Sequence, residues 1–378
     1  MPGRLDPLWV ESADGVEWVA DACREAGRFA LDTEADSLHS YFHKVCLIQV
    51  TAADRHALID PLAIDADALR PLWDVVGDPA VPVLMHGADY DIRVLDRDYG
   101  ARVRGLEDTQ IMAQLLGEPK TGLAALLERD VGVGLDKKHQ RADWGRRPLS
   151  RELREYAAAD TAYLDRLGAG LRLRLEGLER WSWAEEEFQR LEQVRYAEPP
   201  TDERAFERVK GVGRLRGEAR DRAYTLYEWR EGVARRLDLP PFKVLGNHPL
   251  LELAEQPVEH FNELPARAGL GPRFARRWGR EVVELLVSPR RAPDRIRSPR
   301  QPSPPEAMQR RLQRLTAVRD GEADRLGLQG GLVCPKATLT AIAELGADPS
   351  RDALRSAGLD GWRFERLADG FLDALRVT

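Results

Sequence analysis

An internal repeat constrains the C-terminal half of this 378-residue chain more than any other feature. Residues 230–239 recur at 319–328 with six identities and no gap, and the triplet 268–270 recurs at 357–359. The offset is 89 residues throughout. Chance similarity between helices rich in arginine and leucine is the alternative, and a gapless match over this span argues against it. The chain is therefore expected to contain two copies of one helical module of about 70–80 residues.

Two proline-rich segments mark further boundaries. Residues 197–202 form a short hinge, and residues 288–305 hold six prolines and five arginines with almost no apolar side chain. We expect the second segment to be a solvated linker, extended where proline dominates. The predicted parts are an N-terminal domain (1–196), a first helical domain (203–288), a Pro/Arg-rich linker (289–305) and a second, more divergent helical domain (306–378).

The N-terminal domain alternates short β-rich runs with helical patterns, which is typical of a mixed α/β fold. Strands are predicted at 28–33, 45–51, 56–59 and 81–86. Helices are predicted at 13–25 behind a Ser12 cap, at 66–76 and at 89–98, followed by a long helical pattern from 151 towards 191.

Charge is distributed unevenly along the chain. The net charge is −6, but residues 1–200 carry 25 basic and 37 acidic side chains, whereas the remainder has a net charge of +6. An acidic N-terminal half joined to a basic C-terminal half is a pattern that the function of the chain has to explain.

Several protein classes are excluded. With 43% hydrophobic and 32% charged residues the chain is globular, and it has neither a long apolar run nor a signal-peptide pattern, so no membrane association is expected. Cys23, Cys46 and Cys334 lie far apart, which predicts a reducing cytoplasm without disulfides or structural zinc. His39 and His43 lack a third zinc ligand and fit a surface connection. The sequence contains neither of the glycine motifs that bind nucleotide phosphates, so no nucleotide cofactor is expected.

The most informative acids are Asp32 and Glu34, at the end of the apolar strand. Side chains at i and i+2 of a strand share one face, so two carboxylates project together and repel unless a cation bridges them. Hard cations such as Mg²⁺ or Mn²⁺ suit these ligands. Taken alone, the pair is equally consistent with two acids that are exposed to solvent at the edge of a strand.

Two further signals each have a plain structural alternative. Asp89 and Asp91 follow a predicted strand, where Asp89 fits a helix cap and Asp91 lies either on the wet face or at a site. Tyr156 and Asp160 are spaced i, i+4 and so share one helix face, with three alanines between them. A half-buried tyrosine beside an exposed aspartate is the alternative.

Together the four acids and the tyrosine resemble the DEDDy branch of the DEDD 3′–5′ exonucleases, and ribonuclease D in particular. The matching segments are LDTEAD (31–36), LIDPL (58–62), LMHGADYDIRVL (84–95), LEDTQIMAQLLG (106–117), LDKKHQRADWGRRPLS (135–150) and EYAAADTAYL (155–164). The twin modules are similar to HRDC domains of ribonuclease D and RecQ-type helicases. The resemblance implies an α/β RNase-H-like (DnaQ-type) exonuclease domain followed by two all-α HRDC-like domains.

The resemblance also implies a site and a reaction. Asp32, Glu34, Asp91 and Asp160 would hold two divalent metal ions, Mg²⁺ or Mn²⁺, with Asp32 bridging them and Tyr156 orienting the attacking water. Asp91, not Asp89, matches the acid of the second motif. The expected activity is hydrolysis of RNA from a free 3′ end to nucleoside 5′-monophosphates, with tRNA precursors as the expected partners in 3′-end maturation. A DNA exonuclease of the same superfamily and a non-catalytic RNA-binding adaptor are the alternatives.

A basic run precedes the helix that bears Tyr156. It contains Lys137, Lys138, Arg141, Arg146 and Arg147, with Trp144 among them. Phosphate contact together with base stacking is one interpretation, with Lys137, Lys138, Arg141 and Trp144 as the substrate-binding residues. An exposed loop whose tryptophan packs on the domain is the other. The segment 210–213 (KGVG) is likewise either a phosphate-binding turn or a plain interdomain turn.

Overall fold

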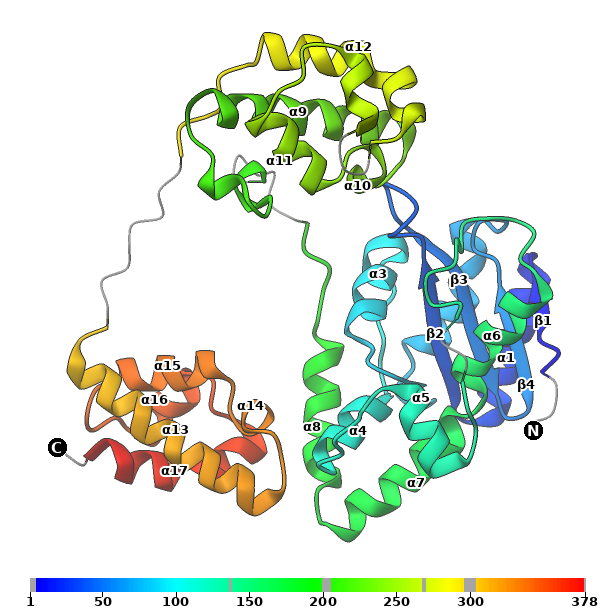
Figure 1. Cartoon of the computed structure of the whole chain (residues 1–378). Helices are drawn as coiled ribbons and strands as arrows, with labels where there is room; N and C mark the ends of the chain where they lie inside the picture. Colours follow the sequence, from blue (N-terminus) through cyan, green and yellow to red (C-terminus); the bar gives the residue numbers. More distant parts are fainter. Residues whose placement is uncertain (1–4, 136–137, 199–204, 267–269, 296–303, 377–378) are drawn as a thin grey trace. The chain divides into compact units, whose positions relative to one another are not determined.

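The computed structural model describes residues 5–135, 138–198, 205–266, 270–295 and 304–376 (Figure 1). Its contacts divide the chain into two compact units. The first unit comprises Met1–Glu34, Val45–Tyr196 and Pro302–Thr378, and the second comprises Ala35–Lys44 and Ala197–Gln301. The domain limits given above stay predictions. In the described ranges, no helix is both long and apolar enough to cross a membrane.

The N-terminal part of the first unit is built on one mixed sheet with the strand order β1-β4-β3-β2-β5-β6. Its strands are β1 (Leu8–Val10), β2 (Phe29–Ala35), β3 (Val45–Ala52), β4 (Arg55–Ile59), β5 (Val83–Met85) and β6 (Leu106–Asp108). The pairs β1–β4, β2–β5 and β5–β6 are parallel, and β3–β4 is antiparallel. All four predicted strands form. The two that the sequence did not predict, β1 and β6, have three residues each, too few to show an alternation.

The first predicted helix is confirmed as α1 (Ala13–Ala26). The Ser12 hydroxyl accepts the Gly15 N–H, and Gly27 ends the helix at a φ of 72°. α1 buries Val16, Val19 and Cys23 and packs against β3, β4 and α2 (Arg70–Val76), which follows the 3₁₀ turn η1 (Ala66–Leu69). Every residue of β3 is buried, so both faces of the sheet are covered there.

The predicted cap at Asp89 is wrong. Helix α3 (Asp89–Tyr99) has Ala88 at its N-cap, and Asp89 is the first helical residue. The Asp89 carboxylate binds the Arg93 guanidinium at 2.9 Å, one turn further along. The amide of Ala88 instead reaches the carboxylate of Asp108, which comes from a different strand.

The long helical pattern from residue 151 forms three helices rather than one, α6 (Arg151–Ala162), α7 (Leu164–Gly177) and α8 (Trp181–Glu192). The second break passes through Glu179, whose φ is 56°. Tertiary contacts hold this break, because the Arg180 guanidinium donates to the carbonyl oxygens of Leu115 and Leu326 at 2.8 and 2.7 Å. Neither break contains a proline or a glycine cluster that would have marked it in the sequence.

Shorter elements complete the domain: α4 (Thr109–Leu115), α5 (Leu123–Leu126) and the π-helical turn η2 (Leu127–Val131). α7 packs against β5 and α4, and α8 packs against β6 and α4.

The repeat predicted from the sequence is confirmed. The first copy comprises α9 (Gly217–Leu237), α10 (Pro241–Val244), α11 (Asn247–Glu255) and α12 (Pro272–Val287), preceded by η3 (Phe206–Arg208) and η4 (Val212–Arg214) and interrupted by η5 (Phe261–Ala266). The second copy comprises α13 (Glu306–Leu326), α14 (Gly330–Val333), α15 (Lys336–Glu344), α16 (Arg351–Ser356) and α17 (Gly361–Arg376). Helices α9, α10, α11 and α12 have the same lengths as α13, α14, α15 and α17.

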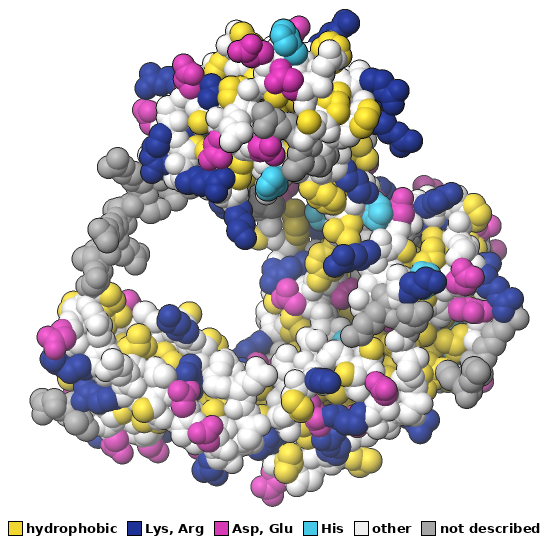
Figure 2. All heavy atoms as spheres, viewed as in Figure 1, with side chains coloured by type: hydrophobic (Ala, Val, Ile, Leu, Met, Phe, Trp, Pro, Cys, Tyr) yellow, Lys and Arg dark blue, Asp and Glu magenta, His cyan; other side chains and the backbone are white. Residues whose placement is uncertain are grey.

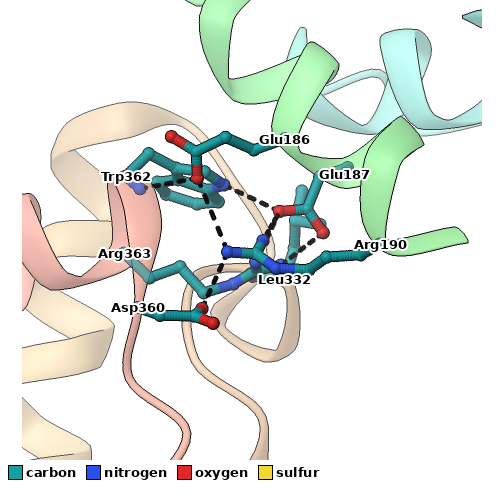
Figure 3. A network of polar contacts seen from close by, with 7 residues as sticks. All are labelled: Glu186, Glu187, Arg190, Leu332, Asp360, Trp362 and Arg363. Atoms are coloured by element: carbon teal, nitrogen blue, oxygen red, sulfur yellow. Dashed lines mark hydrogen bonds and ion pairs between the residues drawn. The ribbon is translucent and has the colours of Figure 1, made fainter. Parts of the chain in front are cut away.

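The second copy packs on helix α8 of the N-terminal domain, within the first unit (Figure 3). The rings of Trp183 on α8 and Trp362 on α17 stack at 4.5 Å with an angle of 9° between their planes. Gly117, at the end of α4, permits a close approach, because a Cβ there would lie 2.2 Å from the carbonyl oxygen of Gly327.

The prediction of a solvated linker is wrong for its first part. Residues 289–295 pack on α9, where the backbone N–H of Ala292 donates to Asp221 at 2.8 Å and Arg220 donates to the carbonyl of Pro293 at 2.7 Å. Ala292 is buried in the core of the second unit. This part of the linker is thus held by hydrogen bonds to its backbone groups, although its composition is polar. Residues 296–303 of the linker lie outside the described residues.

Candidate active site

A cavity of about 480 Å³ opens at the carboxyl end of β2. It is lined by Asp32, Thr33, Glu34, His86, Gln110, Gly122, Leu123, Ala124, Leu135, Gln140, Tyr156, Asp160 and Leu164. Four of the five residues predicted to do chemistry are among them. The other lining residues include three leucines, two glutamines and a histidine, so acidic and apolar side chains share the cavity.

Strand β2 places two acids in the cavity. Phe29, Ala30 and Leu31 are buried, which fixes the strand in the core and directs its end outward. Asp32 and Glu34 both line the cavity, as their i, i+2 spacing predicts. Between them, the Thr33 hydroxyl donates to Asp91 Oδ1 at 2.5 Å.

Asp91 lies behind this strand rather than on the cavity wall. It is 8% exposed and sits in the first turn of α3. The turn before α3 is held by Asp108, a fully buried residue that accepts the backbone N–H groups of Gly87 at 3.1 Å and Ala88 at 2.8 Å. The same carboxylate accepts two amides at the start of α4. Asp108 was missed in the sequence analysis: its position before α4 indicates a helix cap, but its bonds to the α3 turn are tertiary.

Helix α6 supplies the tyrosine and the last acid. Ser150 caps the helix by accepting the Leu153 N–H, and Ala157 and Ala158 are buried beneath it. Tyr156 and Asp160 both line the cavity. The next residue, Thr161, is tied to Thr51 on β3 through their hydroxyls at 2.8 Å, which fixes the rotation of α6 about its axis.

The acids perturb one another. Burial, followed by the charges of Asp91, Asp160 and Glu34, raises the pKa of Asp32 well above its usual range. Burial raises the pKa of Glu34 to about 9, with Asp160 and Asp91 adding to the shift. Burial raises the pKa of Asp160 to about 7 and that of Asp91 to about 6. No lysine or arginine of the described ranges forms an ion pair with any of the four.

The residue chemistry fits divalent metal ions. Four carboxylates with no cationic partner in the described part of the chain form an all-oxygen donor set, which hard cations prefer. Across those same residues, no three acidic, histidine or cysteine side chains already converge as a metal site. Asp91 in particular is engaged by the Thr33 hydroxyl. The arrangement therefore offers the ligands, with Asp91 set back from the others.

The basic run next to the site is only partly available to a substrate. Trp144 is 1% exposed and stacks on Tyr156 at a ring distance of 6.1 Å, so its predicted role in stacking on a base is wrong. The packed tryptophan of the alternative interpretation is what the structure has. Lys138 and Arg141 are exposed and flank Gln140, which lines the cavity. Lys137 lies outside the described residues.

Arg147 has a structural role. Its guanidinium binds the buried Asp60 at 2.6 and 2.7 Å and donates to the Cys46 carbonyl at 2.7 Å. It thereby anchors the loop beneath which Trp144 packs. In the segment 210–213, Gly211 has a φ of 102° and a Cβ there would lie 2.5 Å from Leu251, so a close-packed turn explains its glycine.

Cavity residues that carry no motif were missed as well. His86, Gln110 and Gln140 line the cavity but have no spacing that singles them out. His86 Nδ1 lies 2.9 Å from the Thr109 hydroxyl, and a Cβ at Gly87 would lie 3.1 Å from the side-chain carbonyl oxygen of Gln110. Only the packing of β5 beside β6 brings these two segments together.

Comparisons with known proteins match both kinds of domain in the chain. Residues 7–176 match a 3′–5′ exonuclease family model, and residues 219–286 and 308–375 each match the HRDC domain model. The chain is 31% identical to ribonuclease D of Acidiphilium cryptum, an alignment that covers 100% of this chain and 94% of that protein. It is also 31% identical to ribonuclease D of Escherichia coli, with 75% of each chain covered.

Solved structures show the same fold. The crystal structure of Escherichia coli RNase D, described as an exoribonuclease involved in structured RNA processing, has a TM-score of 0.64 at 24% identity and covers 98% of this chain and 99% of its own. The catalytic core of RRP6 from Trypanosoma brucei has a TM-score of 0.67 at 25% identity, covering 76% and 80%. The predicted fold class is confirmed. Because ribonuclease D sequences align along the whole chain and both domain types occur in the same order, the protein belongs to the ribonuclease D family, whose members are hydrolases of the 3′–5′ exonuclease type.

Proposed function

We propose that this protein is a metal-dependent exoribonuclease that removes nucleotides from the free 3′ end of RNA as nucleoside 5′-monophosphates, with tRNA precursors as its substrates in the cytoplasm. The observation that carries the proposal is the set of buried, mutually repelling carboxylates gathered with a tyrosine around one cavity. A structural role does not account for acids whose charge meets no cation in the described ranges, because unpaired buried charge is destabilising.

The four acids would share one task. Asp32, Glu34, Asp91 and Asp160 would hold two divalent cations, Mg²⁺ or Mn²⁺. Such a pair acidifies a bound water and stabilises the charge on the leaving 3′ oxygen. Thr33 would position Asp91 through its hydroxyl, and Asp108 would position the turn from which Asp91 projects.

Tyr156 would orient the attacking water by a hydrogen bond from its phenol. A phenol has an ordinary pKa near 10, so it is a poor general base at neutral pH, and positioning suits it better. Its ring is fixed by Trp144 on one side and by the edge of His139 at 5.6 Å on the other. This packing explains why a buried tryptophan lies in the basic run.

The cavity dimensions favour a single-stranded end. A volume of about 480 Å³ suits one small ligand such as a terminal nucleotide, and the lining leucines Leu123, Leu135 and Leu164 suit a base. Lys138 and Arg141, exposed beside Gln140, would contact phosphates. The tRNA substrate rests on the family's resemblance and on the processing of structured RNA by the Escherichia coli relative.

A time course on end-labelled RNA and DNA of matched sequence tests the proposal. Wild type and Asp32→Asn would be incubated with Mg²⁺, Mn²⁺ or EDTA. We expect stepwise loss from the 3′ end of RNA, only with metal and only with Asp32 intact. Equal or faster attack on DNA would make the chain a DNA exonuclease, and binding without cleavage would make it an adaptor. A precursor tRNA with a 3′ extension, offered in competition with an unstructured RNA, tests the substrate.

A further inference from the structure

Residues 35–44 connect β2 to β3, and they pack in the second unit on the end of α9. Asp238, which ends α9 at a φ of 48°, accepts the backbone N–H groups of Tyr41 at 3.0 Å and of Phe42 at 2.9 Å. The Tyr41 ring packs against the apolar cluster of Val233, Ala234 and Val244. The connection is thus held in one conformation by its backbone hydrogen bonds and by the packing of the Tyr41 ring.

This packing leaves large apolar side chains in solvent. Phe42 is 58% exposed, Phe242 on α10 is 55% exposed and Leu38 is 43% exposed. Phe42 lies next to the docked Tyr41, and Phe242 precedes Lys243, whose ammonium lies 3.0 Å from His39 Nδ1 in the connection. We refer to Leu38, Phe42, Phe242, Lys243 and Arg235 as the aromatic–cation surface.

The cations of this surface contact neutral groups, and Glu231, whose charge acts on Arg235, is itself paired with Arg230 at 3.2 Å. Lys243 contacts an imidazole nitrogen, and Arg235 donates to the Tyr41 phenol oxygen at 3.4 Å while lying over the same ring. The neighbouring acids are already engaged. Asp36 accepts from Ser40 and Lys44, and Asp238 accepts the two amides of the connection. Positive charge therefore borders the exposed rings.

We propose that the aromatic–cation surface binds single-stranded RNA, with bases stacking on Phe42 and Phe242 and phosphates contacting Lys243 and Arg235. The inference rests on the proposed function and adds a second binding site to it. Exposed aromatic rings beside cations are the combination that holds single strands without sequence preference. Residues 197–301 contain 21 basic and 16 acidic side chains, so the wider unit also favours a polyanion. The connection starts directly after Glu34 in sequence, so this site is covalently continuous with the strand that carries two of the acids.

Binding to a labelled 12-nucleotide RNA, measured by fluorescence anisotropy, tests the site. The full chain would carry Asp32→Asn to prevent hydrolysis, with Phe42→Ala, Phe242→Leu and Lys243→Gln added singly. We expect each ring substitution to weaken binding by about 5- to 100-fold. Lys243→Gln should reduce the slope of log affinity against log salt by about 0.7. Val287→Ala, at another exposed apolar residue of the same unit, is the control and should change neither quantity.

A second readout separates this inference from the proposed function. In the background with Asp32 intact, Phe242→Leu should raise KM for the 12-mer and leave kcat/KM for a dinucleotide unchanged. Unaltered RNA affinity in both ring variants, or an unaltered salt slope in Lys243→Gln, would overturn the site. Self-association that depends on these rings, without an effect on RNA, would assign the surface to a protein partner instead. Failure of the unsubstituted chain to hydrolyse either substrate would overturn the proposed function.

Discussion

Two acidic clusters lie in the first unit, and they differ in what surrounds them. At the cavity, Asp32, Glu34 and Asp160, together with the adjoining Asp91, meet no cation in the described ranges. On α8, Glu186 and Glu187 meet the second helical copy, where Glu187 accepts from Arg363 at 2.5 and 3.1 Å and from the Trp362 indole at 2.9 Å (Figure 3).

The second cluster is complete in itself. Arg190, on the same helix, pairs with Glu187 and binds Asp360 at 2.7 Å. Arg363 also donates to the Leu332 carbonyl at 3.0 Å, and the backbone N–H of Trp362 donates to Glu186 at 2.9 Å. Acids whose partners the chain supplies, such as the half-buried Glu186 and Glu187, serve structure. Buried acids that meet no cation of the described chain are available to a cation from outside.

The largest expected difference between the clusters is in catalysis. Asp32→Asn should lower kcat by at least about 10³-fold, since it removes a ligand from the proposed two-metal site. Glu187→Gln is the matched carboxylate-to-amide control, and its kcat per folded molecule should stay near that of wild type. Initial rates on end-labelled RNA, with folding checked by circular dichroism, give the result. An equal loss of kcat in the two variants would contradict the different roles assigned to the two acidic clusters.

For the free energy of unfolding, the larger effect is expected at the contact between α8 and the second copy. Trp362→Ala should cost about 3–5 kcal/mol, because the ring is fully buried against Trp183. The equivalent residue of the first copy is Arg273, which is exposed, so Arg273→Ala is the matched control and should change the free energy of unfolding by less than about 0.5 kcal/mol. Urea unfolding followed by tryptophan fluorescence measures both. A loss below about 1 kcal/mol for Trp362→Ala would show that the second copy is only loosely associated.

Removal of the Tyr156 hydroxyl group separates a role in orienting water from a role in binding metal. Tyr156→Phe should lower kcat by about 10²-fold, which is typical for the loss of one positioned proton donor or acceptor. Its affinity for Mn²⁺, measured by calorimetry, should be unchanged because the four acids remain. A parallel loss of metal affinity would make Tyr156 part of the metal site rather than a group that orients water.

The smallest expected effect is on pH dependence in the absence of divalent ions. The pKa values of Glu34 and Asp160 are raised in the folded state to about 9 and about 7. The folded chain therefore binds more protons than the unfolded chain between pH 7 and 9, so stability should fall as pH rises through this window, by on the order of 1 kcal/mol. Urea unfolding in EDTA at pH 7 and 9 checks the sign, and Glu34→Gln should flatten the dependence. A rise in stability with pH would contradict the raised pKa values of Glu34 and Asp160.

The two helical copies show how one sequence pattern acquires different surroundings. The first copy lies in a segment, 197–301, with a net charge of +5, whereas residues 302–378 contain 11 basic and 11 acidic side chains. At the positions where the second copy has Trp362 and Arg363, the first has Arg273 and Phe274. These substitutions account for the packing of the second copy on α8. The proposed RNA-binding surface is on the first copy.

Much of the fold followed from local rules. The repeat was read at its true offset, α1 began at its Ser12 cap, and the spacing of Asp32 and Glu34 predicted that both would face one cavity. These features depend on a few neighbouring residues and on fixed backbone periods, so one sequence is enough to find them. The candidate acids themselves became convincing only through the family resemblance, since each alone had an ordinary structural explanation.

Tertiary structure decided the rest. Trp144 packs in the core with Leu47 and Leu58, which lie elsewhere in the sequence, and its loop is anchored by the ion pair of Arg147 with Asp60. The cap at Ala88 depended on Asp108 from a neighbouring strand, and the break before α8 depended on carbonyl groups of two other helices. The sequence by itself determined which groups are available and how they repeat along an element. Only packing determined which of them are paired, because burial and partners come from residues far apart in the chain.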